Sequence, residues 1–305
     1  MHLLIPYAAA LAEDGRAAAP RRPRLDALIE SGIEIERDLG DAWALSTPHE
    51  RALARALGIE GGNGCLPWAA RQARLDGMPP DDLAWGLLTP AHWHAGALQV
   101  SMTDPEALDL DAADSRTLFE AVQPLFTSEG YVCAWGAPLR WYVAHESLAQ
   151  LATASPERAI GRDVDAWLGS DPAARRLRRL QSEVQMLLHT HPINAAREAR
   201  GRPTVNSFWI SGCGVGQPDR GPVPSVDARL RAPALAGDWG AWSEAWEALD
   251  AGPLAELQAQ WHAGAASRLT LCGERGWVAY APGPSGSLQR LRRLWSRPVP
   301  PWELL

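Results

Sequence analysis

Short apolar runs alternate with stretches of helical spacing at the start of the chain. Residues 2–5 form an apolar run, and residues 24–30 place leucine and isoleucine at three- and four-residue steps. Residues 33–36 alternate between isoleucine and glutamate, which is the pattern of a strand with one exposed face. A Thr-Pro pair at positions 47 and 48 is typical of a helix start. This alternation favours an α/β fold with a mostly parallel sheet flanked by helices.

The middle of the chain has a pattern of its own. Within residues 84–150 the pattern predicts a strand, a helix and two further strands. We therefore expect a core domain formed by residues 1–83 and 151–305, with a smaller α/β lobe inserted at residues 84–150.

A long helix is predicted for residues 172–189, where leucine and valine recur at three- and four-residue steps. Its first turns carry four arginines, which fit a solvated helix face or, alternatively, an anion-binding edge. These are Arg175, Arg176, Arg178 and Arg179. Residues 205–210 are typical of a buried strand, and the glycines after them predict a turn. Tryptophans at positions 239, 242 and 246 have helical spacing and predict core packing.

Composition narrows the possible functions. The 305 residues include 29 arginines and no lysine, against 36 acidic residues, for a formal net charge of −7. The absence of lysine excludes a P-loop lysine and a Schiff-base lysine. The acidic balance argues against a broad nucleic-acid surface, which needs a net basic face.

The spacing of the cysteines and the length of the apolar runs indicate the cellular compartment in which we expect the protein. The four cysteines are widely spaced and form no CxxC pair, so we expect buried, reduced thiols. No apolar run approaches the length of a membrane span, and no basic segment precedes the first apolar run. We expect a soluble, cytoplasmic protein that neither binds nor crosses a membrane.

Polar residues with the character of a binding site are concentrated in residues 183–214. Two of the three asparagines, Asn194 and Asn206, lie there, together with Arg197 and a strand that ends in glycines. Ligands of open α/β sheets bind beyond the carboxyl ends of strands, so glycine amides and an arginine there are suited to an anion. The alternative is that both asparagines merely hold loop backbone in place.

Two His-x-His pairs raise the question of a metal. His92 and His94 form one pair, and His189 and His191 the other. Residues i and i+2 of a strand share a face and are able to chelate one ion. Neither pair has an acidic residue nearby in a recognisable ligand pattern, so we expect no metal at either.

Three segments resemble a known family. They are RPRLDALIESG (22–32), SPERAIGR (155–162) and HPINAAREARGRPTVNSFWISGCG (191–214). They resemble the archaeal-type cofactor-independent phosphoglycerate mutases of the alkaline-phosphatase-like superfamily, in particular a proteobacterial branch that includes RpfE-type regulatory proteins. The likeness runs over most of the chain and is most specific at residues 181–214. It implies an alkaline-phosphatase-like α/β fold.

The departures from that family bear on its chemistry. The resemblance implies a serine nucleophile between two metal ions held by Asp and His, a first Asp ligand after the first strand, and a late Asp-His pair. This chain has Pro6-Tyr7 at the first position and Cys272-Gly273-Glu274 at the second. The family's lysine has no counterpart. Where the nucleophile is expected, the chain offers Ser46-Thr47-Pro48-His49 without flanking carboxylates of the expected kind.

Three functions follow as hypotheses. The first is a degenerate, regulatory protein without catalytic residues or cofactor, which binds a phosphorylated or carboxylated metabolite, or a protein partner, through a retained anion pocket. The second is an active mutase or phosphatase with a rebuilt Mn²⁺ or Zn²⁺ site. Its ligands would come from scattered acids such as Asp14 or Asp41 and from five histidines, His49, His92, His94, His189 and His191. The third is an interaction module that exposes some of the 15 tryptophans. The expected pocket residues are Arg162, His191, Asn194, Arg197, Asn206, Ser207, Gly212 and Gly214.

Overall fold

The computed structural model describes residues 1–10, 12–78 and 82–283, and the chain divides into two compact units. Unit 1 comprises Met1–Gly58 and Asp219–Leu305, and unit 2 comprises Ile59–Pro218. The predicted boundaries differ from this division. The expected lobe at residues 84–150 lies wholly within unit 2, which extends beyond it on both sides.

Unit 1 is built on a mixed five-stranded sheet with the order β2-β11-β10-β1-β9. Strand β1 pairs in parallel with β9 and β10, whereas β11 is antiparallel to both β10 and β2. The bounds are β1 His2–Ile5, β2 Gly32–Leu39, β9 Ser225–Val226, β10 Arg268–Cys272 and β11 Gly276–Pro282.

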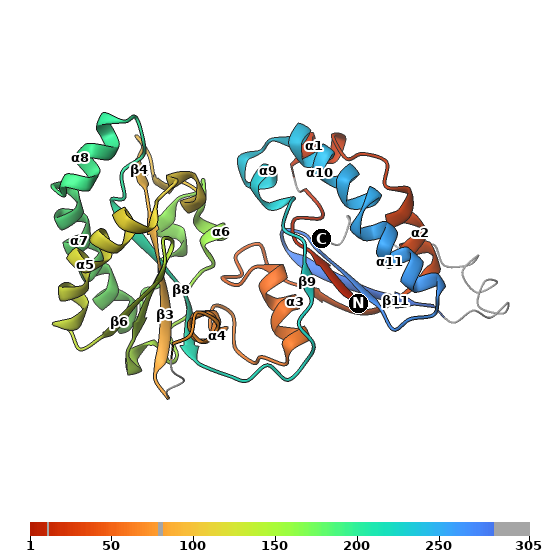
Figure 1. Ribbon diagram of the computed structural model, residues 1–305, viewed down its shortest axis with the longest axis horizontal. Coiled ribbons are helices and arrows are strands. Elements are labelled where there is room, and N and C mark those ends of the chain that lie inside the picture. Colours follow the sequence, from red (N-terminus) through yellow and green to blue (C-terminus); the bar gives the residue numbers. More distant parts are fainter. Residues whose placement is uncertain (11, 79–81, 284–305) are drawn as a thin grey trace. The chain divides into compact units, whose positions relative to one another are not determined.

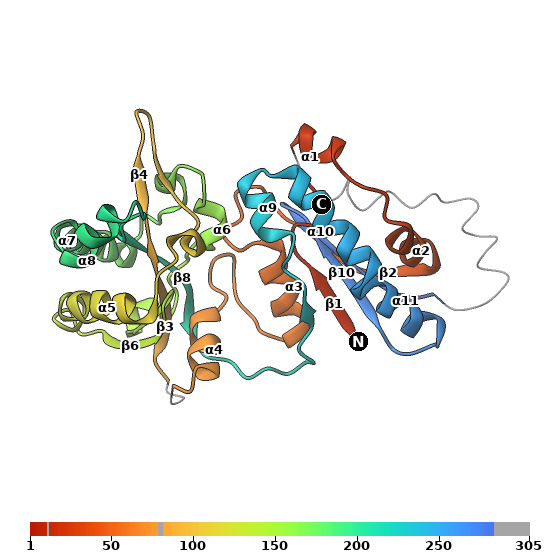
Figure 2. The ribbon, with the colours of Figure 1, turned by 45° about the horizontal axis from the view of Figure 1, so that its top comes forward.

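Helices cover both faces of this sheet (Figures 1 and 2). Leu3 and Ile5 pack with α2, α10 and α11 on one face, and Leu4 packs with α3 on the other, as the alternation of a strand requires. Trp242 and Trp246 of α10 are buried in the first of these layers, which confirms the expected core role of that stripe. The helices are α1 Glu13–Ala17, α2 Pro23–Ser31, α3 Pro48–Leu57, α9 Arg231–Ala236, α10 Trp239–Ala251 and α11 Pro253–His262.

Unit 2 is built on an antiparallel four-stranded sheet with the order β6-β7-β3-β8. Strand β8 pairs with β3, although a long stretch of chain separates them. A separate hairpin joins β4 to β5. The bounds are β3 Ala84–Ala91, β4 Trp93–Ala95, β5 Val100–Met102, β6 Val132–Ala137, β7 Arg140–Ala144 and β8 Ser207–Val215.

The two faces of the unit 2 sheet carry different helices (Figure 2). Residues of α5 and α7 form the larger core with one face, and α4 packs on the other through small alanines. The helices are α4 Trp68–Leu75, α5 Ala112–Thr127, α6 Pro156–Ala159, α7 Pro172–His189 and α8 Pro192–Ala199, and the 3₁₀ turns are η1 Pro105–Leu108, η2 Glu146–Leu148 and η3 Val164–Trp167.

The expected α/β character is confirmed, but the expected mostly parallel sheet is wrong. In the described residues, two of the four pairings in unit 1 and all three in the unit 2 sheet are antiparallel. The physical reason is chain connection. Only residues 273–275 separate β10 from β11, and so short a link joins antiparallel strands only.

Local helix signals are confirmed. Thr47 caps α3 in a capping box with Glu50, and Gly58 ends the helix in the left-handed conformation at φ 68°. Helix α7 has the predicted bounds, with Asp171 accepting hydrogen bonds from its first free N–H groups. No helix in the described part of the chain is long and apolar enough to cross a membrane.

Candidate functional site

The carboxyl ends of β1, β9 and β10 meet at one edge of the unit 1 sheet, because the three strands are parallel. Tyr7 follows β1 there in the left-handed conformation, at φ 57°, which is uncommon for a residue with a Cβ. Its carbonyl oxygen accepts a hydrogen bond of 3.0 Å from the indole of Trp242. The N–H of Ala8 donates to the carbonyl of Cys272 at 2.7 Å, which ties the ends of β1 and β10 together.

The start of α3 lies in the same unit, and its free N–H groups are capped by side chains of the helix itself. The Thr47 hydroxyl accepts from the Glu50 N–H, while the Glu50 carboxylate accepts from the Thr47 N–H at 2.9 Å. The His49 ring lies 5.8 Å from that of Tyr7, centroid to centroid. Ser46 and Thr47 are buried.

These residues do not fit the two-metal centre that the family resemblance implies. A phenol ring stands where a carboxylate ligand is expected, and Cys272 ends β10 where an Asp-His pair is expected. Among the described residues, no three His, Cys, Asp or Glu side chains are grouped so that they could hold a metal ion. The histidines considered for a rebuilt site are divided between the units, with His49 in unit 1 and the two His-x-His pairs in unit 2.

Asn194 and Asn206 of the predicted anion pocket bind backbone. The Asn194 amide donates to the carbonyls of Leu188 and Val205, both at 2.8 Å, and its oxygen accepts from the Val205 N–H at 2.9 Å. The Asn206 side chain accepts from the N–H of Trp93 and donates to its carbonyl. These contacts match the alternative that the asparagines hold loop backbone in place.

Arg197 is 1% exposed and also binds carbonyl groups. Its Nε donates to Pro203 at 2.9 Å, and its Nη2 donates to the Leu108 carbonyl at the end of η1. Burial lowers its pKa, while the carboxylates of Asp114, Asp109 and Asp111 oppose that change. Its Nη1 is buried and has no hydrogen-bond partner among the described residues.

The remaining predicted residues are dispersed within unit 2. His191 caps α8 by accepting from the Ile193 N–H, the Ser207 hydroxyl receives the Gln185 amide at 3.2 Å, and Arg162 is exposed beyond α6. Gly212 and Gly214 lie inside β8, so the turn predicted for them is wrong. A Cβ on Gly212 would come within 2.8 Å of the backbone nitrogen of Ala69, so this glycine permits close packing of α4 on the strand.

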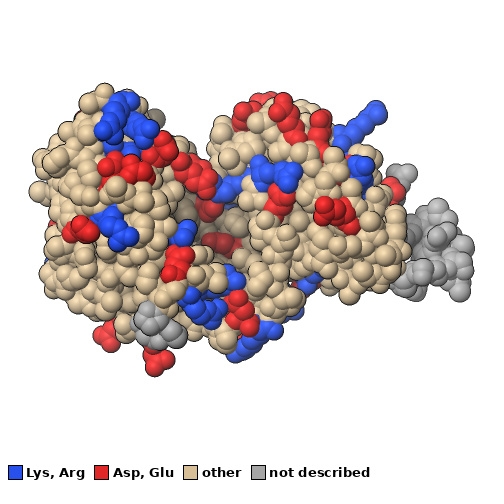
Figure 3. All heavy atoms as spheres, in the orientation of Figure 1, with Lys and Arg blue, Asp and Glu red and all other residues tan. Residues whose placement is uncertain are grey.

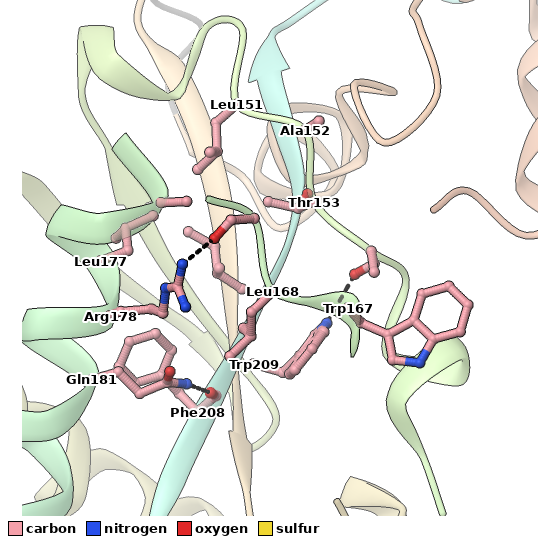
Figure 4. A pocket seen from close by; sticks show the side chains of 14 residues that line it. Leu151, Ala152, Thr153, Trp167, Leu168, Leu177, Arg178, Gln181, Phe208 and Trp209 are labelled. Carbon is pink, nitrogen blue, oxygen red and sulfur yellow. Dashed lines mark hydrogen bonds between the residues drawn. The ribbon is translucent and has the colours of Figure 1, made fainter. Parts of the chain in front are cut away.

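Unit 2 contains a pocket that the sequence patterns did not predict. It has a cavity volume of about 40 Å³ and lies between residues 151–154, residues 167–169, the first half of α7 and the first half of β8 (Figure 4). Leu151, Leu177 and the Trp209 ring make its lining largely apolar. The sequence predicts two of its walls, the helix α7 and the strand β8. The other two, residues 151–154 and 167–169, have no hydrophobic pattern that predicts their structure.

Three hydrogen bonds hold the walls of this pocket in place (Figure 4). Trp209 Nε1 donates to the Ala154 carbonyl at 2.8 Å, and Gln181 Nε2 donates to the Phe208 carbonyl at 2.7 Å. Arg178 Nη2 donates to the Gly169 carbonyl at 2.6 Å. Each bond joins two different walls, so the pocket is formed before any ligand enters.

The four arginines at the start of α7 divide into two pairs. Arg176 and Arg179 form ion pairs with Glu129 at 3.0 and 2.6 Å. Arg175 and Arg178 bind the carbonyls of Ser170 and Gly169, both at 2.6 Å. In the part of the chain that the structure describes, neither of these two has a carboxylate partner.

One face of the molecule and the four thiols complete the description of polar and reactive groups. On the face shown in Figure 3, basic and acidic side chains are interspersed over the described residues of each unit. All four cysteines are free, and Cys213 and Cys272 are buried while Cys65 and Cys133 are partly buried. Burial raises the pKa of Cys213 to about 12, so its thiol is protonated and a poor nucleophile at neutral pH.

Comparison with known proteins gives distant likenesses to solved structures. No family model matches the chain, and no curated protein matches it. One similar solved structure is "Cofactor-Independent Phosphoglycerate mutase from Thermoplasma Acidophilum DSM 1728", at 15% identity and a TM-score of 0.39, covering 92% of this chain and 89% of that one. Another is PH0037 protein from Pyrococcus horikoshii, at 14% identity and a TM-score of 0.44, covering 94% and 88%. Identities and TM-scores this low establish neither family nor activity.

Proposed function

We propose that this chain is a degenerate relative of the phosphoglycerate-mutase-like proteins that acts by binding a ligand and does not transfer phosphate. The observation that carries the proposal is Tyr7 at the end of β1. Its backbone conformation, the hydrogen bond from Trp242 to its carbonyl, and the His49 ring against its own all support a structural role at the place where the resemblance implies a metal ligand.

Two neighbouring features support the same proposal. The Thr47 hydroxyl caps α3 and lies 3.2 Å from His49 Nε2, but among the described residues no group of side chains that could hold a metal ion accompanies it. Cys272 ends β10 as a buried thiol at the place where the resemblance implies an Asp-His pair. A clamp of two metal ions on attacking and leaving oxygens has no counterpart in these groups.

In this proposal the polar cluster around Asn194 and Arg197 is scaffold, because its side chains already bind carbonyl groups. The ligand, a small carboxylated or phosphorylated metabolite, then binds elsewhere in the chain. A regulatory role in the cytoplasm, which the resemblance to the RpfE-type branch implies, would be exercised through that binding or through a protein partner.

Metal retention combined with turnover tests the proposal. The purified chain is incubated with Mn²⁺ or Zn²⁺, desalted, analysed for metal by mass spectrometry, and assayed for phosphoglycerate mutase and phosphatase activity. We expect essentially no retained metal and no metal-dependent turnover. About two ions per chain together with turnover would show the alternative, an enzyme with a rebuilt metal site, to be correct.

A His191→Ala variant distinguishes the two hypotheses further, since His191 is expected to bind a metal ion only in the rebuilt-site hypothesis. In the structure its imidazole accepts from the Ile193 N–H at the start of α8. If turnover is found and this variant abolishes it without unfolding unit 2, the residue serves a metal site. Under the proposal, the variant changes only stability.

A further inference from the structure

We infer that the pocket between α7 and β8 of unit 2 binds a short-chain aliphatic monocarboxylate of about four carbons. This deepens the proposed binding function, on which it rests, by naming a site and a ligand class. None of the residues that the sequence indicated for an anion pocket lines it, and it combines an apolar interior with an exposed arginine in its lining (Figure 4).

The interior excludes a strongly polar ligand. Three carbonyl groups in its walls, those of Ala154, Gly169 and Phe208, already accept side-chain hydrogen bonds. The surfaces left to a ligand come largely from Leu151, Leu177 and the Trp209 ring. A phosphate group needs several donors around it and finds too few here, whereas methylene groups gain from burial.

The opening favours one negative charge. Arg178 is exposed, lines the pocket and uses Nη2 for the bond to Gly169. Its guanidinium has five N–H donors, so others remain for a carboxylate. Arg178 is the basic residue of the lining, and the carboxylate of Asp171 is engaged by the N–H groups at the start of α7.

The volume of the cavity limits the length of the ligand's hydrocarbon chain. A water-sized group needs about 10–15 Å³ of cavity volume measured in this way. The 40 Å³ of this cavity therefore admits about three water-sized groups, and because a methylene is larger than a water, the apolar part of a ligand has at most about three carbons. With the carboxylate at the arginine outside them, the ligand has about four carbons, as butyrate does.

Butyrate is the probe for the test, and ligand-observed NMR titration gives its Kd for the full chain. We expect saturable binding of butyrate and much weaker binding of 1-butanol, which has the same body without the charge, and of inorganic phosphate, which has charge without the body. Arg178→Gln should raise the Kd for butyrate about tenfold, the loss of one charge-assisted hydrogen bond.

Arg179→Gln is the matched control, because it removes the same charge from the same helix at a residue paired with Glu129. It should leave the Kd within about twofold of the wild-type value. Ala152→Leu places extra carbons at the pocket wall, where the alanine is only partly buried, and should abolish binding while thermal unfolding shows the fold intact.

Three results would overturn the inference. These are no saturable binding of butyrate, equal binding of butyrate and 1-butanol, or equal effects of the Arg178 and Arg179 variants. Each leaves the proposed lack of phosphoryl transfer standing, since metal retention and turnover measure that separately. Turnover with bound metal would instead refute the proposed function. The butyrate titration would still test the carboxylate site independently.

Discussion

The indole N–H of Trp242 donates a hydrogen bond of 3.0 Å to the carbonyl oxygen of Tyr7, across a sequence separation of 235 residues. This bond ties α10 to the turn after β1 and satisfies a carbonyl in a strained conformation. Trp246, one turn further along α10, differs in this respect, because its Nε1 atom is buried and has no hydrogen-bond partner among the described residues.

Trp242→Phe should therefore cost more stability than Trp246→Phe. Both substitutions remove similar volume from buried positions of one helix, but only the first removes the donor of an observed hydrogen bond. We expect the free energy of unfolding to fall by about 1–3 kcal/mol more for Trp242→Phe. Urea denaturation of the two variants measures the difference, and equal losses would mean that the hydrogen bond contributes nothing.

The left-handed backbone of Tyr7 gives a second prediction. Tyr7→Ala and Tyr7→Gly both remove the ring, but only glycine adopts φ 57° without a steric penalty. Tyr7→Gly should thus be more stable than Tyr7→Ala by about 1–2 kcal/mol. A calorimetric comparison of the two variants decides this, and a more stable alanine variant would show that the turn relaxes when the ring is lost.

Local features of the fold could be predicted from the sequence, because their causes lie within a few residues of each other. The Thr47-Pro48 start of α3 and the spacing of leucines in α7 act within single helices. The pairing of β3 with β8 could not be predicted in this way, since it joins strands from distant parts of the chain. The expected mostly parallel sheet was wrong for a different reason, because helical and strand spacing carries no information on strand direction.

The candidate site was harder to predict than the fold. Asn194 and Arg197 have the residue types of an anion pocket, yet both bind carbonyl groups of the chain itself. Residue type alone does not distinguish a donor aimed at a ligand from one aimed at backbone. The pocket beside Arg178 was missed because residues 151–154 and 167–169, which form two of its walls, meet α7 and β8 only in the folded chain.

Arg197 is predicted to contribute to stability rather than to anion binding. Arg197→Met keeps the length of the side chain but leaves the Pro203 and Leu108 carbonyls without their donor. The loss should be about 2–5 kcal/mol in the free energy of unfolding. Arg200→Met, in the exposed end of the same helix, should change it by less than about 0.5 kcal/mol. A stable Arg197→Met variant with weakened phosphate binding would restore the anion pocket as the better interpretation.

Gly212 is predicted to be required by packing as well as by backbone conformation. Gly201, with φ 67°, has no atom within 4 Å of an added Cβ, whereas at Gly212, with φ 64°, the backbone of Ala69 blocks that position. Gly201→Ala should cost about 1–2 kcal/mol from its conformation alone. Gly212→Ala should cost about 1–3 kcal/mol more because α4 must shift. Thermal unfolding of the pair tests this, and equal shifts in Tm would mean that α4 moves freely.

His2 makes stability depend on pH in a defined window. Burial above all, then the charges of Arg268 and the N-terminal ammonium, lower its pKa from 6.5 to about 4 in the folded chain. Between those two pH values the unfolded chain binds more protons than the folded chain. The contribution of His2 to stability is therefore fully present above pH 6.5 and is lost as the pH falls toward 4.

His2→Gln keeps a polar group near the Thr270 hydroxyl but does not titrate. Its urea midpoint should therefore fall less between pH 7 and about pH 5 than that of the wild type. A variant at His2 that retains the wild-type pH dependence would show that other groups cause the loss.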